Sequence, residues 1–180
     1  MRNKHVRDMV LAAMFLALGW LLPFLTGNIP EIGGMLLPMH LPVLICGIIL
    51  GPRYGFLIGL ILPITRSFMF GMPPFPIAAV PMTFELAAYG GIIGIMYSKL
   101  PKTIPSIYIS LIVAMLAGRI VWAAARVAML GLMDTPFSFQ IFLTSAFISS
   151  WPGIVLQIVL IPVLIVAIKK AGWERSAQYS

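Results

Sequence analysis

Four charged side chains lie inside long apolar stretches of this sequence, where a charge is costly. They are Arg66, Glu85, Arg119 and Arg126. A charge near the centre of a bilayer costs about 2.5–3.5 kcal/mol on insertion scales, so such residues usually face a bundle interior or pair with one another. A guanidinium group is a planar fork that matches a carboxylate. The chemistry expected of these residues is therefore recognition by charge and hydrogen bonding.

Arginine outnumbers glutamate in this set by three to one. Arg119 and Arg126 are seven residues apart and share one helix face, with Trp122 one turn from each. In a purely structural alternative, Glu85 neutralises one arginine and another arginine extends to lipid headgroups. Three arginines against one glutamate leave about two positive charges uncompensated. Because that is expensive in a membrane, we expect an outward-facing pocket for a small anionic or strongly polar solute.

Other polar and aromatic residues are candidates for lining this pocket. His40 lies between Pro38 and Pro42, and proline removes a backbone donor, so the helix here should be distorted. Irregular backbone survives at membrane depth only where it is buried or lines a cavity. Tryptophan is common at membrane interfaces in any case, which makes Trp151 ambiguous. The remaining candidates are Tyr89 and Gln157, with Asn28 and Glu31 in an outer loop.

The sequence lacks the motifs of several common catalytic sites. It has no Gly-x-x-x-x-Gly-Lys loop, no His-Glu-x-x-His and no Gly-x-Ser-x-Gly. Cys46 is the single cysteine, which excludes an internal disulfide and a thiolate metal cluster. No acidic residues are paired in a way that suits a metal ion. We therefore expect no enzyme activity, no metal and no cofactor.

The elements that position these residues are predicted to be membrane-spanning helices. Of the 180 residues, 61% are hydrophobic and only 9% are charged, against about 25% charged in an average globular chain. Continuous apolar runs exclude an outer-membrane barrel, in which apolar and polar residues alternate. With about 20 residues needed for each span, the sequence predicts six spans: Met9–Leu25, Gly34–Leu50, Tyr54–Phe70, Ala78–Tyr97, Ile104–Leu130 and Phe139–Ile168.

Lysine and arginine predict the orientation of these spans, because cytoplasmic loops are enriched in both. With the N-terminus inside, the cytoplasmic segments hold nine of the twelve basic residues, and the outer loops hold none. We expect an all-α integral membrane protein, with residues 1–180 forming a single bundle of six transmembrane helices and both termini cytoplasmic. This topology accounts for the net charge of +7 without a nucleic-acid partner.

The first predicted span carries a motif for close helix contact. Ala13 and Ala17 are four residues apart, with Ala12 beside them. Such pairs of small residues allow two membrane helices to approach closely. The pair is common in helices, so packing within the chain and contact with another protein both remain open.

Several segments resemble the substrate-binding S-components of energy-coupling factor (ECF) transporters, and the resemblance extends over essentially the whole chain. An N-in, six-helix chain with an Ala-x-x-x-Ala first helix and no ATPase motif is the general pattern of that family. The segments that carry the resemblance are Met39–Gly47, Pro63–Ser67 with Phe70–Pro74, Phe84–Gly90 and Gly118–Trp122.

The resemblance implies a mechanism and partners. An S-component captures a vitamin with high affinity at the extracellular side of a prokaryotic cell membrane. It then associates with a transmembrane coupling subunit and two cytoplasmic ATPase subunits, and it is thought to topple and release the vitamin inside. The resemblance assigns the contact with the coupling subunit to Ala13 and Ala17.

The intramembrane arginines favour pantothenate as the vitamin, because pantothenate carries a carboxylate. The alternatives are a form of vitamin B6 and hydroxymethylpyrimidine, which need less positive charge and more aromatic stacking. Substrate-binding candidates are Arg66, Glu85, Arg119, Trp122, Arg126, His40, Tyr89 and Gln157. Two hypotheses of other classes also fit: a membrane scaffold that binds no solute, and a stand-alone secondary transporter.

Overall fold

The computed structural model describes residues 2–26, 29, 35–132 and 150–170, and within these ranges every regular element is a helix. Six are α-helices and one is a short 3₁₀-helix. The elements are α1 (Arg2–Leu21), η1 (Leu22–Thr26), α3 (His40–Leu50), α4 (Pro52–Phe70), α5 (Ala79–Lys99), α6 (Ile104–Leu132) and α8 (Trp151–Lys170).

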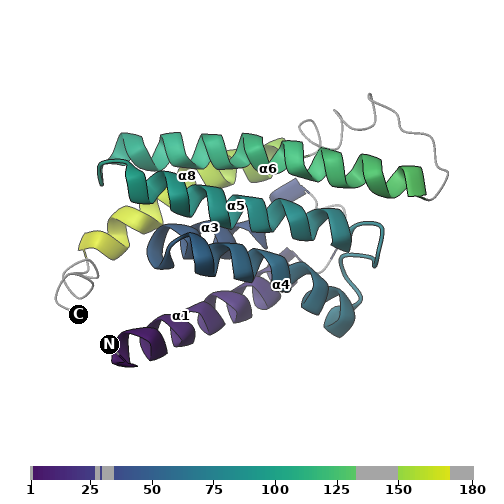
Figure 1. Cartoon of the computed structure of the whole chain (residues 1–180), viewed down its shortest axis with the longest axis horizontal. Helices are drawn as coiled ribbons and strands as arrows, with labels where there is room; N and C mark the ends of the chain where they lie inside the picture. The colour runs from purple at the N-terminus through teal and green to yellow at the C-terminus, as the bar shows by residue number, and fades with distance from the viewer. Residues whose placement is uncertain (1, 27–28, 30–34, 133–149, 171–180) are drawn as a thin grey trace.

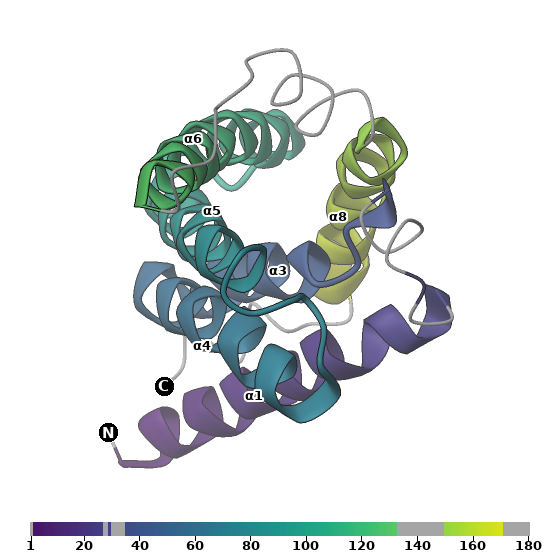
Figure 2. The same cartoon turned by 90° about the vertical axis from the view of Figure 1, so that its right-hand side faces the viewer.

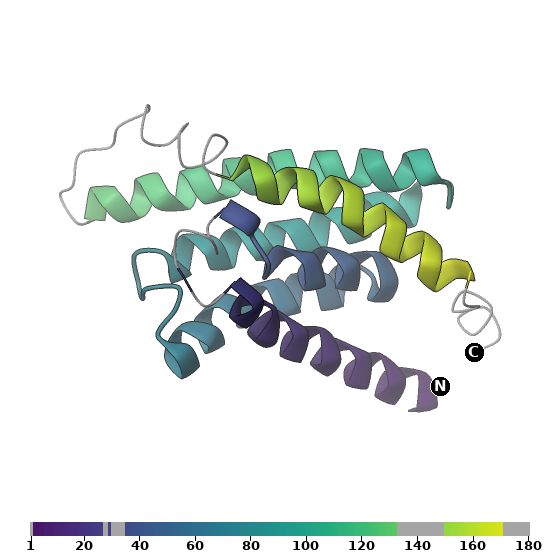
Figure 3. The same cartoon turned by 180° about the vertical axis from the view of Figure 1, so that it is seen from behind.

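Helix α5 lies at the centre of the bundle and packs against α3, α4 and α6 (Figure 1). Viewed along the bundle, α3, α5, α6 and α8 surround the long axis, and α1 crosses the outside of α3 and α4 (Figure 2). From behind, α8 runs beside α3 and α6 (Figure 3). The Trp20 indole nitrogen donates to the Thr65 hydroxyl at 3.1 Å and joins α1 to α4.

Glycine allows the backbones of α3, α4 and α5 to touch. A Cβ added to Gly90 would lie 2.1 Å from the carbonyl oxygen of Gly55, and one added to Gly59 would lie 2.2 Å from that of Leu86. On α3, a Cβ on Gly47 would lie 2.5 Å from the Gly90 oxygen. Membrane helices that approach this closely need small residues at the contact. This glycine contact fixes α5 firmly against its neighbours.

Helix α3 is shorter than predicted. The expected span Gly34–Leu50 contains a helix of only 11 residues that begins at His40, and residues 30–34 lie outside the described ranges. Leu37 has a positive φ of 50°, and the His40 amide donates to the Leu37 carbonyl at 3.0 Å. Proline explains the difference, because the residue before Pro38 is disfavoured in a helix. The distortion expected around His40 is confirmed.

Among the described residues, four helices are long and apolar enough to cross a membrane: Lys4–Leu25, Ala79–Lys99, Ile104–Gly131 and Trp151–Lys170. Helix α3 is too short for this criterion. Helix α4, with 19 residues that include Arg53 and Arg66, does not meet it either. The predicted boundaries of the fourth and fifth spans agree with α5 and α6 to within two residues. The sixth predicted span began at Phe139, and its first eleven residues lie outside the described ranges.

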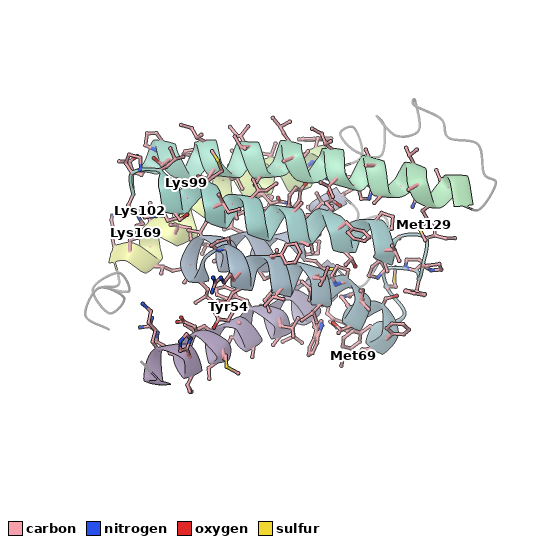
Figure 4. The ribbon with its side chains drawn as sticks, in the orientation of Figure 1. Tyr54, Met69, Lys99, Lys102, Met129 and Lys169 are labelled. Atoms are coloured by element: carbon pink, nitrogen blue, oxygen red, sulfur yellow. The ribbon has the colours of Figure 1, made fainter. Side chains whose placement is uncertain are left out.

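The two ends of the bundle differ in charge. Lys99, Lys102 and Lys169 lie together at the end where α5 and α8 finish, and Met69 and Met129 lie at the opposite end (Figure 4). We refer to these as the lysine end and the opposite end.

Candidate functional site

A buried ion pair joins α5 to α6. Arg119 Nη1 lies 2.9 Å from Glu85 Oε1, and the two side chains are only 7% and 1% exposed. Glu85 lies six residues after α5 begins at the opposite end of the bundle, roughly 9 Å along the helix. Two charges removed from water repay their desolvation only with close contact and further hydrogen bonds. The pair therefore needs further hydrogen bonds from the groups around it.

His40 faces the same carboxylate from α3. Its Nε2 lies 3.7 Å from Glu85 Oε1, which is too long for a hydrogen bond, and the side chain is 1% exposed. Neither ring nitrogen has a hydrogen-bond partner among the described residues. Buried polar atoms are normally partnered. His40 therefore holds a donor and an acceptor that are available to a third group.

Tyr89 closes one side of this group of residues. It follows Glu85 by one turn of α5, is 1% exposed, and places its ring centroid 5.3 Å from that of His40. Gly118 provides the space, because a Cβ there would lie 2.0 Å from the Tyr89 ring. Sequence reasoning missed this role of Gly118. Its only sequence signal is a glycine directly before an intramembrane arginine.

Gln157, on α8, is a further buried polar residue in this half of the bundle. It is 0% exposed, and neither its amide nitrogen nor its amide oxygen has a partner among the described residues. One turn earlier, Gly153 packs against the backbone of Met35 and Leu36, just before α3. Gln157 therefore lies at the same end of the bundle as the start of α3. We define the polar cluster as His40, Glu85, Tyr89, Arg119 and Gln157.

Further unpartnered atoms belong to Arg119. Its Nε and Nη2 have no hydrogen-bond partner within the described part of the chain. Leaving a buried donor unsatisfied costs about 1–3 kcal/mol, and more for a charged group. The cluster thus presents unpartnered arginine, histidine and amide nitrogen and oxygen atoms on α3, α6 and α8, in addition to the Arg119 Nη1 that pairs with Glu85.

The other two intramembrane arginines lie outside the polar cluster. Arg66 Nη1 donates to the carbonyl of Met72, and the guanidinium lies 5.7 Å from the ring centroids of Phe24 and Phe70. Arg126 Nη1 donates to the carbonyl of Ile77 at 2.8 Å. Both arginines therefore hold the connection 71–78 between α4 and α5. Among the ion pairs of the described residues, Arg119 is the arginine that pairs with Glu85.

The remaining predicted residues have varied positions. Trp122 is half-buried on α6, one turn from Arg119. Trp151 is 60% exposed at the start of α8, as expected of an interfacial anchor. Asn28 and Glu31 lie outside the described residues. Cys46 is a buried free thiol in the core, and no group of three or more potential metal-ligating side chains occurs in the described ranges.

Comparison with known proteins identifies the family. Residues 7–166 match the model of the family described as "ECF transporter, substrate-specific component". No curated protein and no solved structure is significantly similar to the chain. The match covers most of the sequence and agrees with an apolar, all-helical structure that holds a buried polar cluster. The chain therefore belongs to the family of substrate-specific components of ECF transporters, which are substrate-binding membrane subunits rather than enzymes.

Proposed function

We propose that this chain captures a small water-soluble vitamin from outside a prokaryotic cell and delivers it to the cytoplasm through a transmembrane coupling subunit and two ATPase subunits. The observation that supports this proposal is the set of buried, unpartnered polar atoms on His40, Arg119 and Gln157. Such atoms cost stability unless they serve a ligand. The family match supports the class of function, and the polar cluster is the proposed binding site for the vitamin.

The proposed orientation has the lysine end in the cytoplasm. Glu85 and Gln157 each lie six residues from the start of a helix at the opposite end, so solute from outside would travel only roughly 9 Å along the bundle. An impermeant thiol reagent checks the orientation. It should label a cysteine substituted at Lys99 only after the cells are opened, and labelling of intact cells would contradict the orientation.

The identity of the vitamin depends on the charge of the cluster. The excess of intramembrane arginine favours pantothenate. That preference loses part of its basis here, because Glu85 pairs with Arg119, while Arg66 and Arg126 donate to the connection 71–78 and do not join the cluster. A vitamin B6 form and hydroxymethylpyrimidine are the alternatives, and the flat rings of His40 and Tyr89 favour a ring-shaped solute.

The direct test of vitamin capture is binding to the purified chain. We expect one of pantothenate, pyridoxine or hydroxymethylpyrimidine to bind at one site per chain, measured by calorimetry. Vesicles that contain the chain alone should not accumulate the bound vitamin, because the chain has no ATPase motif. Accumulation would indicate a secondary transporter instead. Absence of binding by these vitamins and of any co-purifying small molecule would indicate a scaffold.

Helix α1 is the proposed docking surface for the coupling subunit. Its main packing partners among the described α-helices are α3 and α4, and Ala13 is exposed and Ala17 half-buried on its surface. Large apolar side chains surround them, including Met9, Val10, Met14 and Leu18. An apolar helix face with small residues at its centre permits close approach of a second membrane helix.

Ala13→Trp should abolish vitamin uptake by the complete transporter while leaving vitamin binding to the purified chain unchanged. The bulky ring prevents close helix approach, and the polar cluster lies on other helices. Ala124→Trp is the matched control, because Ala124 is exposed on α6, away from the docking surface. Uptake at the normal rate by the Ala13 variant would show that α1 does not dock the coupling subunit.

A further inference from the structure

We propose that the polar cluster selects a solute that is uncharged at neutral pH and discriminates against a carboxylate on the same scaffold. The inference rests on the proposed function, since it names the class of solute that the cluster binds. It departs from the expectation drawn from the arginine count, and it is carried by the pairing of charges around Glu85.

With His40 uncharged, the side chains of the cluster sum to zero charge. Arg119 contributes one positive charge, and Glu85, 2.9 Å away, contributes one negative charge. Within the described residues, the ion pairs of Glu85 are with Arg119 and, at 3.7 Å and only if protonated, with His40. Arg66 and Arg126 are held by the carbonyls of Met72 and Ile77. These carbonyls are uncharged, so Arg66 and Arg126 keep their positive charges, but neither residue belongs to the polar cluster. Within the cluster itself, the Arg119 charge that an anionic solute would need is already paired with Glu85.

A carboxylate entering this cluster would compete with Glu85 for Arg119. The occupied site would then contain two carboxylates and one guanidinium, all removed from water, since Glu85 and Arg119 are 1% and 6% exposed. Like charges at short range in a buried site repel strongly, and an uncompensated buried charge is expensive. An uncharged solute avoids this cost and leaves the ion pair intact.

The unpartnered atoms describe the complementary solute. Arg119 offers two donors, at Nε and Nη2. Neutral His40 offers one donor and one acceptor, and the Gln157 amide offers both kinds of group. The rings of His40 and Tyr89 lie with their centroids 5.3 Å apart, and His40 Nε2 lies 3.7 Å from Glu85. A small heteroaromatic solute with a ring-nitrogen or hydroxyl acceptor and a hydroxyl or amino donor satisfies this set without bringing a charge.

Two matched pairs of probes isolate the charge of the solute. Pantothenol is pantothenate with the carboxylate replaced by a hydroxymethyl group, and pyridoxine relates to pyridoxic acid in the same way. We expect the neutral member to bind at least about tenfold more tightly, a difference that calorimetry on the purified chain resolves. The ratio of the two affinities is measured for each pair in which at least one member binds.

Glu85→Gln should reverse this preference, because it leaves Arg119 as an uncompensated cation. The carboxylate member of the pair should then bind more tightly than the neutral one. The double variant Glu85→Gln/Arg119→Gln carries no charge at either position, and although it should bind more weakly because the Arg119 donors are lost, its residual binding should favour the neutral member again. Arg53→Gln is the matched control: it removes an exposed arginine at the lysine end and should leave the preference of the wild-type chain unchanged.

The outcomes separate this inference from the proposed function. Tighter binding of the carboxylate member by the wild-type chain would overturn the inference and leave vitamin capture standing. An unchanged neutral preference in Glu85→Gln, with the double variant showing the same ratio, would also overturn it, since the ion pair would not set the selectivity. Failure of all four probes and of hydroxymethylpyrimidine to bind would overturn the proposed function, and this inference with it.

Discussion

Arg119→Gln should abolish high-affinity solute binding and lower the free energy of unfolding by about 3–5 kcal/mol, the cost typical of removing one partner of a buried ion pair. The substitution leaves the carboxylate of Glu85 1% exposed without its arginine partner, and His40 Nε2 at 3.7 Å lies beyond hydrogen-bond distance. Thermal and chemical unfolding in detergent, followed by calorimetry with the bound vitamin, measures both effects.

The double variant Glu85→Gln/Arg119→Gln is the decisive comparison. It removes both charges together, so most of the lost stability should return, because replacing a whole buried pair is often close to neutral. Equal stability of the single and double variants would show that Glu85 is not left uncompensated. The ion pair would then not be a structural unit.

Gly90→Ala should destabilise the bundle by about 1–3 kcal/mol or more, the range for overpacking a well-packed contact. The new Cβ would lie 2.1 Å from the carbonyl oxygen of Gly55, so the backbones of α4 and α5 must separate. Binding should weaken as well, because Glu85 and Tyr89 lie on the same helix. The effect is read from unfolding and from vitamin affinity.

The neighbouring residue provides a matched control. A Cβ on Gly91 would lie 3.6 Å from the Phe56 side chain, an ordinary contact. Gly91→Ala should therefore keep binding and gain up to about 1 kcal/mol from the better helix propensity of alanine. Equal behaviour of the two variants would argue that backbone approach between α4 and α5 does not limit stability.

Hydropathy predicted the long helices well, because α5 and α6 are continuous apolar segments bounded by turns. It predicted α3 poorly. Pro38 and Pro42 lie in a run that is apolar throughout, so composition alone does not show that the helix begins as late as His40. The glycine contact between Gly55 and Gly90 was also not predicted, because it depends on two residues far apart in sequence.

The candidate site was predicted in composition and only partly in arrangement. Glu85, Arg119, His40 and Tyr89 were all candidates, and the structure brings them together. Counting charges could not show which arginine pairs with Glu85, since that depends on the packing of α5 against α6. Arg66 and Arg126 share the membrane setting of Arg119 but have different partners. The residue types were enough to predict polar recognition, but the net charge of the site could be worked out only from the packing of the helices.

The connection 71–78 shows a second role for arginine within the apolar helices, as a hydrogen-bond donor to a turn. It contains Pro73, Pro74 and Pro76, which have no amide hydrogen to offer. Its carbonyls at Met72, Pro73 and Ile77 instead accept hydrogen bonds from the side chains of Arg66, Ser67 and Arg126. Where prolines leave a turn with few donors of its own, arginines on α4 and α6 donate to its carbonyls. An arginine in a membrane helix can thus be present to donate hydrogen bonds to a nearby turn, and not only to bind an anionic solute.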